Sequence, residues 1–291
     1  MILRGGSRDC HDPSADYVWQ IWPSSGNLIL LNGVCLTGSQ PLIFCVALVC
    51  ACLPFYSFVS GRVPGEPISN SFVILCMWFF IVLALMMKIS FTDPGIIPRR
   101  KLAQRIYSNR SLDLHESEKF IDPYRVDPDA VYCHTCEIMR PSHANHCHDC
   151  GNCVVGFDHH CAVLNNCIGQ RNYIYFFMLL PCLCVMVVCF IFQVKMPSND
   201  SSQKSQSSST LYDTLTFISF AISAVALSLV VALLVYHLWL LIYAKTTTKR
   251  HVRGKTPLGA SFMERLKGHE AHFNLRQRLW EPESLGDIYS P

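Results

Sequence analysis

The densest chemistry in the chain lies between Cys133 and Cys167, a segment that holds seven of the sixteen cysteines and six of the twelve histidines. Thiols and imidazoles at such short spacings are typical of metal ligands rather than disulfides, and structural zinc takes four of them in a tetrahedron. Two such sites use eight ligands, so six cysteines and two histidines are enough once one cysteine is set aside as a nucleophile. His146 and His160 are well placed to be the two histidines. The segment therefore predicts two structural zinc sites and one spare thiol.

Cys161 is the best candidate for the spare thiol. It directly follows Asp158, His159 and His160, so a carboxylate and an imidazole lie within a few residues of it. A cysteine attacks well only when a neighbouring base or a lowered pKa makes the thiolate available. An aspartate beside a histidine can fix the tautomer of the ring and stabilise its charged form. We therefore assign Cys161 as the nucleophile, His159 as the base and Asp158 as the group that orients His159.

Two other interpretations of this segment stay open at this point. The same ligands could hold a zinc-bound docking module in a membrane scaffold that catalyses nothing, although Asp158, His159 and Cys161 would then have no role. A thioesterase would be a different kind of enzyme, but the sequence contains no serine-centred nucleophile elbow. An acyl adduct at Cys161 that hydroxylamine removes would separate an acyltransferase from the scaffold.

The rest of the chain must position this segment, and its composition points to a membrane. Hydrophobic residues make up 51% of the sequence and charged residues only 15%, whereas soluble domains carry about 25% charged residues. A run of about 20 apolar residues can cross a bilayer. Four runs qualify, and they are Pro41–Val59, Ile68–Met87, Tyr173–Val194 and Leu215–Tyr243. The net charge of +3 is too small to indicate a nucleic-acid partner.

The placement of Lys and Arg predicts how these runs are oriented. The two ends of the chain and the segment at residues 88–171 together hold 21 Lys and Arg residues, whereas the two intervening loops hold three. Basic residues accumulate in cytoplasmic loops. A segment dense in free thiols would also stay reduced on that side. Both termini and the Cys/His segment should therefore face the cytosol.

Together these features predict an all-α integral membrane protein with four transmembrane helices and a cytosolic cysteine-rich domain that binds two zinc ions. We expect a cytosolic N-terminal segment at residues 1–40, followed by transmembrane helices 1 and 2 within 41–87. A cytosolic segment at 88–172 then carries the cysteine-rich domain, at 131–177. Transmembrane helices 3 and 4, with a Ser-rich lumenal loop between them, occupy 173–243, and a cytosolic C-terminal tail occupies 244–291.

One continuous motif carries a family resemblance. The sequence from Cys133 to Phe176 reads Cys-x2-Cys-x9-His-Cys-x2-Cys-x2-Cys-x4-Asp-His-His-Cys-x5-Cys-x4-Asn-x3-Phe. It resembles the cysteine-rich domain of the DHHC protein S-acyltransferases, and the four-span layout is similar as well. Asp93-Pro94-Gly95, just after the second apolar run, resembles the Asp-Pro-Gly motif of that family. The resemblance is strong over residues 131–177 and weaker over the rest of about 17–250.

The resemblance implies a role for each residue of the motif. Cys161 would carry the acyl group, with His159 and Asp158 activating it. One zinc ion would be bound by Cys133, Cys136, His146 and Cys153. The other would be bound by Cys147, Cys150, His160 and Cys167. These ligand sets are interleaved along the chain, which would knit the segment together.

The resemblance also implies an activity and partners. The protein would be a protein-cysteine S-palmitoyltransferase that takes a long acyl chain, such as palmitate, from acyl-CoA. It would pass that chain to cytosolic cysteines of membrane-associated proteins, and membrane lipid would surround its helices. We expect no nucleic acid, we leave room for an accessory subunit, and we expect an endomembrane (Golgi or endoplasmic reticulum) rather than the plasma membrane.

Three positions depart from the pattern of this family. Ala162-Val163 stands where Pro-Trp usually follows the reactive cysteine. A Thr-Thr-x-Glu motif after the last span is replaced by Thr246–Lys249, which lacks the acidic residue, and an arginine is missing near His143. We interpret the chain as a divergent member, because every predicted ligand and catalytic position is present.

Overall fold

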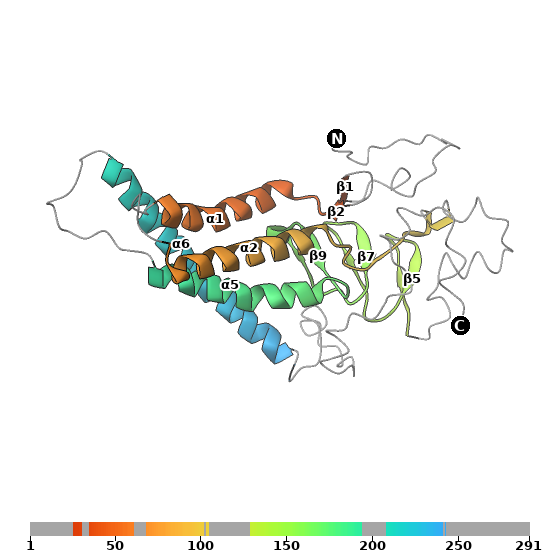
Figure 1. Cartoon of the computed structure of the whole chain (residues 1–291). Helices are drawn as coiled ribbons and strands as arrows, with labels where there is room; N and C mark the ends of the chain where they lie inside the picture. The colour runs from red at the N-terminus through yellow and green to blue at the C-terminus, as the bar shows by residue number, and fades with distance from the viewer. Residues whose placement is uncertain are drawn as a thin grey trace. The chain divides into compact units, whose positions relative to one another are not determined.

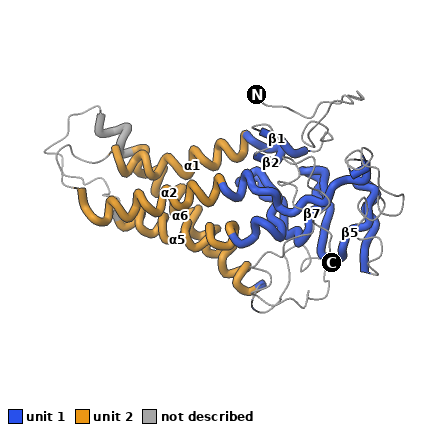
Figure 2. The backbone as a smooth tube through the Cα atoms, turned by 45° about the vertical axis from the view of Figure 1, so that its right-hand side comes forward, with its two compact units in different colours: residues 1–41, 88–174, 240–291 blue, residues 42–87, 175–239 orange. Residues whose placement is uncertain are grey.

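The structure is a computed structural model that describes residues 26–30, 35–60, 68–101, 103–104, 129–193, 208–240 and 242. The chain forms two compact units (Figure 2). Unit 1 contains residues 1–41, 88–174 and 240–291, and unit 2 contains residues 42–87 and 175–239. Most of the expected N-terminal segment, most of the Ser-rich loop and the C-terminal tail with Thr246–Lys249 lie outside the described residues.

Four helices account for the four predicted apolar runs (Figure 1). They are α1 (Pro41–Ser60), α2 (Asn70–Phe91), α5 (Tyr173–Gln193) and α6 (Ser208–Trp239). Each contains a segment long and apolar enough to cross a membrane. The prediction of four transmembrane helices is supported to this extent.

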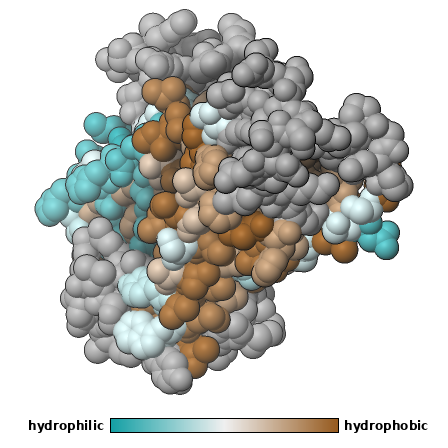
Figure 3. All heavy atoms as spheres, turned by 90° about the vertical axis from the view of Figure 1, so that its left-hand side faces the viewer, coloured by the Kyte–Doolittle hydropathy of each residue, from teal (hydrophilic) through white to brown (hydrophobic). Residues whose placement is uncertain are grey.

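The helices of unit 2 expose most of their apolar side chains and bury only a minority of them against one another. In α2 the buried positions Leu75, Phe79, Val82 and Met86 recur every three or four residues, which places them on one face. Phe79 stacks on Phe55 of α1 with ring centroids 3.9 Å apart. Apolar side chains gather over much of the described surface in Figure 3. Such a surface is expected where lipid rather than water surrounds the helices.

The cysteine-rich part of unit 1 is built from short β-strands, so the all-α expectation is not met there. Each of these strands is two or three residues long. In chain order they are β3 (Ile96–Ile97), β4 (Val131–Cys133), β5 (Ile138–Arg140), β6 (Asn145–Cys147), β7 (Asn152–Val154), β8 (His159–Cys161) and β9 (Asn166–Ile168). An isolated helix needs a dozen residues or more to be stable. Consecutive ligands have at most nine residues between them, which leaves no room for a helix.

Most of these strands pair with the next strand along the chain, but β3 pairs with the distant β7. Strand β4 pairs with β5, β8 pairs with β9, and β7 lies between β3 and β6, all antiparallel. A further antiparallel pair joins β1 (Leu28–Leu30) to β2 (Cys35–Thr37), just before α1. Hairpins of this size are marginally stable in water without further support. Something other than a large core must therefore hold them.

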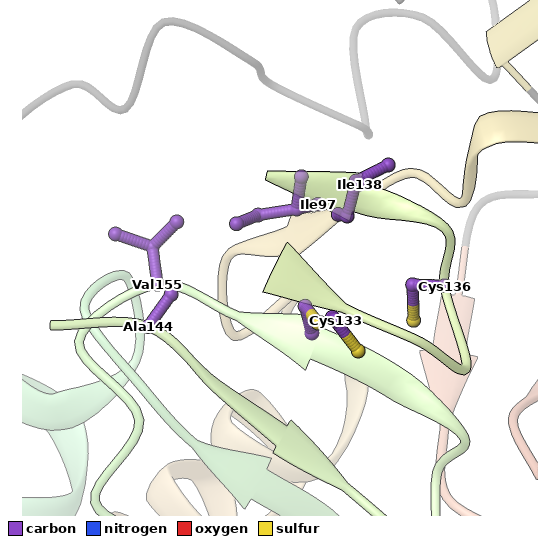
Figure 4. Packing of buried hydrophobic residues seen from close by; sticks show 7 residues of the cluster. Ile97, Cys133, Cys136, Ile138, Ala144 and Val155 are labelled. Carbon is purple, nitrogen blue, oxygen red and sulfur yellow. The ribbon is translucent and has the colours of Figure 1, made fainter. Parts of the chain in front are cut away.

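A small apolar cluster supplies part of that support (Figure 4). Its aliphatic members are Ile97, Ile138, Ala144 and Val155, each at most 5% exposed. They come from β3, β5, and the segments beside β6 and β7. Its remaining members are the cysteines Cys133, Cys136 and Cys153. The apolar cluster and the first predicted metal site therefore share residues, so each would stabilise the other.

Candidate functional site

Two clusters of four side chains each bring together the eight predicted ligands. The first consists of Cys133, Cys136, His146 and Cys153, and the second of Cys147, Cys150, His160 and Cys167. Within each cluster the candidate ligand atoms all lie within 4.8 Å of one another. In both clusters a histidine Nδ1 faces the sulfur atoms. His146 Nδ1 lies 3.3 Å from Cys136 Sγ, and His160 Nδ1 lies 3.4 Å from Cys150 Sγ.

The register of the hairpins explains how the ligands meet. His146 on β6 is directly opposite Cys153 on β7, and both belong to the first cluster. His160 on β8 is directly opposite Cys167 on β9, and both belong to the second. Side chains opposite each other in an antiparallel pair have Cβ atoms about 5 Å apart. Each cluster therefore begins as a cross-strand His/Cys pair that two further cysteines complete.

The electrostatics of the clusters fit a bound cation. A hydrogen bond from the Cys153 thiol lowers the pKa of Cys136 to about 5, and the same bond raises the pKa of Cys153. In the second cluster, hydrogen bonding to Cys147 raises the pKa of Cys150 to about 12 and also raises that of Cys167. In each cluster one thiol, Cys136 or Cys147, thus has a lowered pKa, and its ionisation raises the pKa of the neighbouring thiols. A divalent cation would relieve that repulsion and deprotonate them all.

The strand β8 separates the paired histidines. Successive side chains of a β-strand point to opposite faces, so His159 and Cys161 share one face whereas His160 lies on the other. His160 reaches Cys150 and Cys167 of the second cluster, where its Nδ1 lies 3.6 Å from Cys167 Sγ. Cys161 belongs to neither cluster and is half-buried. The structure thus divides the side of β8 that faces the second cluster from the side that carries the Cys161 thiol.

Asp158 and His159 form an oriented pair beside that thiol. Asp158 Oδ2 lies 2.9 Å from His159 Nδ1, and the Asp158 side chain is fully buried. Burial by itself lowers the pKa of His159, but hydrogen bonds with Asp158 and Cys161 and the charges of both groups raise it to about 9. The carboxylate and the sulfur, on either side of the ring, therefore both favour its protonated form, as a base that accepts a proton from the thiol requires. The predicted base, orienter and nucleophile are brought together.

The segment after α2 is tied to the start of α5 by Asp93. Asp93 Oδ1 accepts hydrogen bonds from the backbone N–H groups of Gly95 and Ile96, each 2.9 Å long. Its Oδ2 pairs with Arg171, two residues before α5 begins. Gly95 has φ +109°, a conformation that favours glycine. Asp93-Pro94-Gly95 thus forms a turn, and Asp93 also supplies an ion pair that the sequence analysis did not identify.

One of the three departures from the family pattern, Ala162-Val163, directly follows Cys161. Ala162 and Val163 begin the short 3-10 helix η2 (Ala162–Leu164). Val163 is 51% exposed, although it is apolar. The helix ends at Asn165, whose backbone is left-handed with φ 48°. Asn165 and its neighbour Asn166 are almost completely buried, and sequence reasoning assigned no role to either of them.

Comparison with known proteins finds a family match over the segment that holds both clusters and Cys161. The family model described as DHHC palmitoyltransferase matches residues 127–255. The chain is 32% identical to palmitoyltransferase ERF2 of Debaryomyces hansenii over 228 residues, which cover 72% of this chain and 61% of that protein. It is 28% identical to palmitoyltransferase ZDHHC14 of Mus musculus over 189 residues, which cover 60% of this chain and 38% of that protein. The chain thus spans less than two thirds of the length of either relative.

Proposed function

We propose that this chain, which carries a DHHC palmitoyltransferase domain, is a protein S-acyltransferase that moves a long acyl chain from acyl-CoA to protein cysteines. The observation that carries the proposal is the arrangement of Asp158, His159 and Cys161. The carboxylate and the ring are 2.9 Å apart, and the ring and the thiol share the face of β8 that points away from the second Cys/His cluster. A nucleophile, a base and an orienter are the groups that acyl transfer through a thioester requires.

In the first step His159 accepts the proton of Cys161, and the resulting thiolate attacks the carbonyl carbon of the acyl-CoA thioester. The tetrahedral intermediate collapses as the carbon–sulfur bond to CoA breaks, and His159 returns the proton to the departing CoA thiolate. In the second step His159 accepts the proton of a substrate cysteine, and the resulting thiolate attacks the carbonyl carbon of acyl-Cys161. The bond between that carbon and Cys161 breaks, and His159 returns the proton to the Cys161 thiolate. Asp158 keeps the His159 ring in one orientation throughout and stabilises its charged form.

The surrounding helices would hold the acyl tail of the donor. Burial contributes roughly 0.8 kcal/mol for each methylene group removed from water. A chain of palmitate length would therefore gain substantial affinity from apolar side chains alone. We propose palmitoyl-CoA as donor, and cysteines of membrane-associated proteins as acceptors, because both keep the reacting sulfur close to a membrane.

Zinc is the metal that we propose for the two clusters. Three thiolates and one imidazole are a common donor set for structural zinc, and four protein ligands leave no open position for water or substrate. The metal would supply folding energy to the short hairpins of unit 1 rather than chemistry. The residues of β8 would then owe their positions to the second ion, since His160 lies between His159 and Cys161.

The purified protein should contain two zinc ions per chain. Cys133→Ser and Cys147→Ser should each lose the ion that the replaced cysteine binds, because they belong to different clusters. Both should lose most self-acylation, since β6 carries one ligand of each cluster and connects the sites. Elemental analysis together with an acylation assay measures both effects. One zinc per wild-type chain would refute the two-site proposal, and full activity of zinc-free protein would refute the structural role.

The membrane orientation is a further part of the proposal. The split of 21 Lys and Arg residues against three supports an arrangement with both termini and the cysteine-rich domain in the cytosol. Epitope tags at either terminus should therefore be reached by antibody after the plasma membrane alone is permeabilised. A tag at the C-terminus that is reached only after internal membranes are opened would contradict this topology.

A membrane scaffold with a zinc-bound docking domain is the alternative. The two functions are separated by incubating wild-type protein with palmitoyl-CoA and measuring its intact mass. An acyltransferase should gain the mass of one acyl group, hydroxylamine should remove it, and peptide mapping should place it on Cys161. Wild-type protein that retains both metals and acquires no acyl group would leave the scaffold as the better explanation.

A further inference from the structure

The turn of the hairpin that carries Cys161 is held on two sides by adjacent asparagines. Cys161 at the end of β8 is directly opposite Asn166 at the start of β9. Asn165 precedes it and closes the intervening turn with its N–H bonded to the carbonyl of Ala162 at 3.1 Å. Asn165 is 1% exposed and Asn166 is fully buried. Amide side chains buried to this extent need hydrogen-bond partners, and these two find theirs in different parts of unit 1.

Asn166 binds the end of α2. Its Nδ2 lies 2.9 Å from the carbonyl oxygen of Ile89, 3.3 Å from that of Ser90 and 2.8 Å from that of Thr92. The last four carbonyls of a helix have no partner within the helix, so this side chain caps α2 from outside. Its Oδ1 accepts the N–H of Cys167 at 2.9 Å, which fixes the amide in one orientation. The residue opposite the nucleophile is therefore attached to the last turn of an apolar helix.

Asn165 binds the segment that leads into α1. Its Nδ2 donates to Thr37 Oγ1 at 3.0 Å and to the carbonyl oxygen of Gly38 at 3.2 Å, and its Oδ1 accepts the N–H of Gln40 at 2.7 Å. Its backbone carbonyl accepts bonds from Gly38 N–H and from Thr37 Oγ1. The approach is so close that a Cβ atom on Gly38 would lie 2.6 Å from the Asn165 oxygen. Gln40 directly precedes the first residue of α1.

We propose that Asn165 and Asn166 are positioning residues that fix the level of Cys161 with respect to the membrane boundary. They connect the catalytic hairpin to the residues just before α1 and to the last turn of α2, and both helices are membrane-span candidates. Neither asparagine belongs to a Cys/His cluster. They act through the pairing of β8 with β9: because Asn166 lies directly opposite Cys161, a displacement of Asn166 also displaces Cys161. This inference rests on the proposed function only for the role of Cys161 as the nucleophile.

The experiment compares two maleimides on the full-length protein in lipid nanodiscs. N-ethylmaleimide reaches Cys161 from water, whereas a hexadecyl maleimide reaches it from the bilayer surface, and mass spectrometry of the Cys161 peptide gives each rate. Asn166→Asp keeps the shape of the side chain but removes the N–H donors and sets a carboxylate against three carbonyls. It should lower the ratio of the hexadecyl to the ethyl rate while both metals remain bound. Palmitoylation at Cys161 should fall about 100-fold, as expected for a reacting group displaced by about 1 Å.

Asn165→Gly provides a second variant, because glycine keeps the left-handed backbone and removes only the side-chain bonds. It should lower the maleimide ratio in the same direction, and it decides the question if Asn166→Asp loses metal. Ile138→Val is the control for a general loss of stability. Ile138 is 1% exposed in the apolar cluster and lies on β5, which pairs with β4. It should lose stability but keep the wild-type ratio.

A maleimide ratio that stays at the wild-type value in both Asn166→Asp and Asn165→Gly would overturn the positioning role. So would an equal fall of the ratio in Ile138→Val, since general destabilisation would then explain the effect. The readout is independent of the proposed chemistry. If wild-type protein takes no acyl group from palmitoyl-CoA, the acyltransferase function fails, yet the maleimide rates still test the positioning role of the two asparagines.

Discussion

Replacing Cys161 with serine is expected to abolish both self-acylation and transfer to a substrate protein, with two zinc ions still bound. A serine hydroxyl is not ionised by a neighbouring imidazole to the extent that a thiol is, so it does not replace the thiolate. Removal of a nucleophile has cost on the order of 10⁶-fold in turnover in a well-measured hydrolase, so the remaining signal should fall below detection. Intact mass after incubation with palmitoyl-CoA and elemental analysis measure the two quantities.

The structure supplies a matched control for this variant. Cys45→Ser makes the same chemical change at an exposed cysteine of α1, which belongs to neither metal cluster. It should leave self-acylation and zinc content at their wild-type values. An acyl group that persists at wild-type level in Cys161→Ser would assign the nucleophile elsewhere. Loss of zinc in that variant would show that Cys161 is a ligand.

The two adjacent histidines should give opposite phenotypes when each is replaced by alanine. His159→Ala should slow self-acylation by about 10²–10⁴-fold, the usual contribution of a general acid–base group, and should retain both metals. His160→Ala should lose one metal and lower the melting temperature, because His160 lies in the second cluster. Single-turnover acylation, elemental analysis and thermal unfolding distinguish the two outcomes.

His134→Ala is the control for this pair. His134 lies between two cysteine ligands but is exposed, and its ring contacts Tyr132 edge-on rather than either cluster. Its loss should change neither metal content nor rate. If His159→Ala lost metal while His160→Ala kept both ions and acylated slowly, the assignment of the paired histidines would be reversed.

The sequence predicted the parts of this molecule that repeat or follow strict spacing. The four apolar runs became α1, α2, α5 and α6, because about 20 residues without charge are sufficient to identify a candidate span. The two sets of ligands also came together as the family resemblance implied, with all candidate ligand atoms of each set within 4.8 Å. Metal-binding patterns are readable in a sequence because ligand type and spacing are both constrained.

The hairpins were not predicted, and neither were the contacts that anchor them. Strands of three residues, such as β8, are too short for an alternating pattern to be recognised in the sequence. The pattern therefore did not show that His159 and His160 point to opposite faces of a strand. The partners of Asn165 are more than 120 residues away along the chain. A buried amide with distant backbone partners has no local sequence signal. Arg171 is similar, since its partner Asp93 lies in another segment.

The alternation of β8 also limits how this protein can change its length. The side of the strand that carries the proposed catalytic groups, His159 and Cys161, and the side that carries a member of the second cluster, His160, alternate residue by residue. One residue inserted into or deleted from a strand sends every later side chain to the opposite face. Such a change here would turn the thiol toward the metal cluster and a ligand away from it, so two functions would be lost at once. Substitutions at neighbouring positions such as Ala162 and Val163 leave this alternation intact, whereas an insertion or deletion within β8 does not.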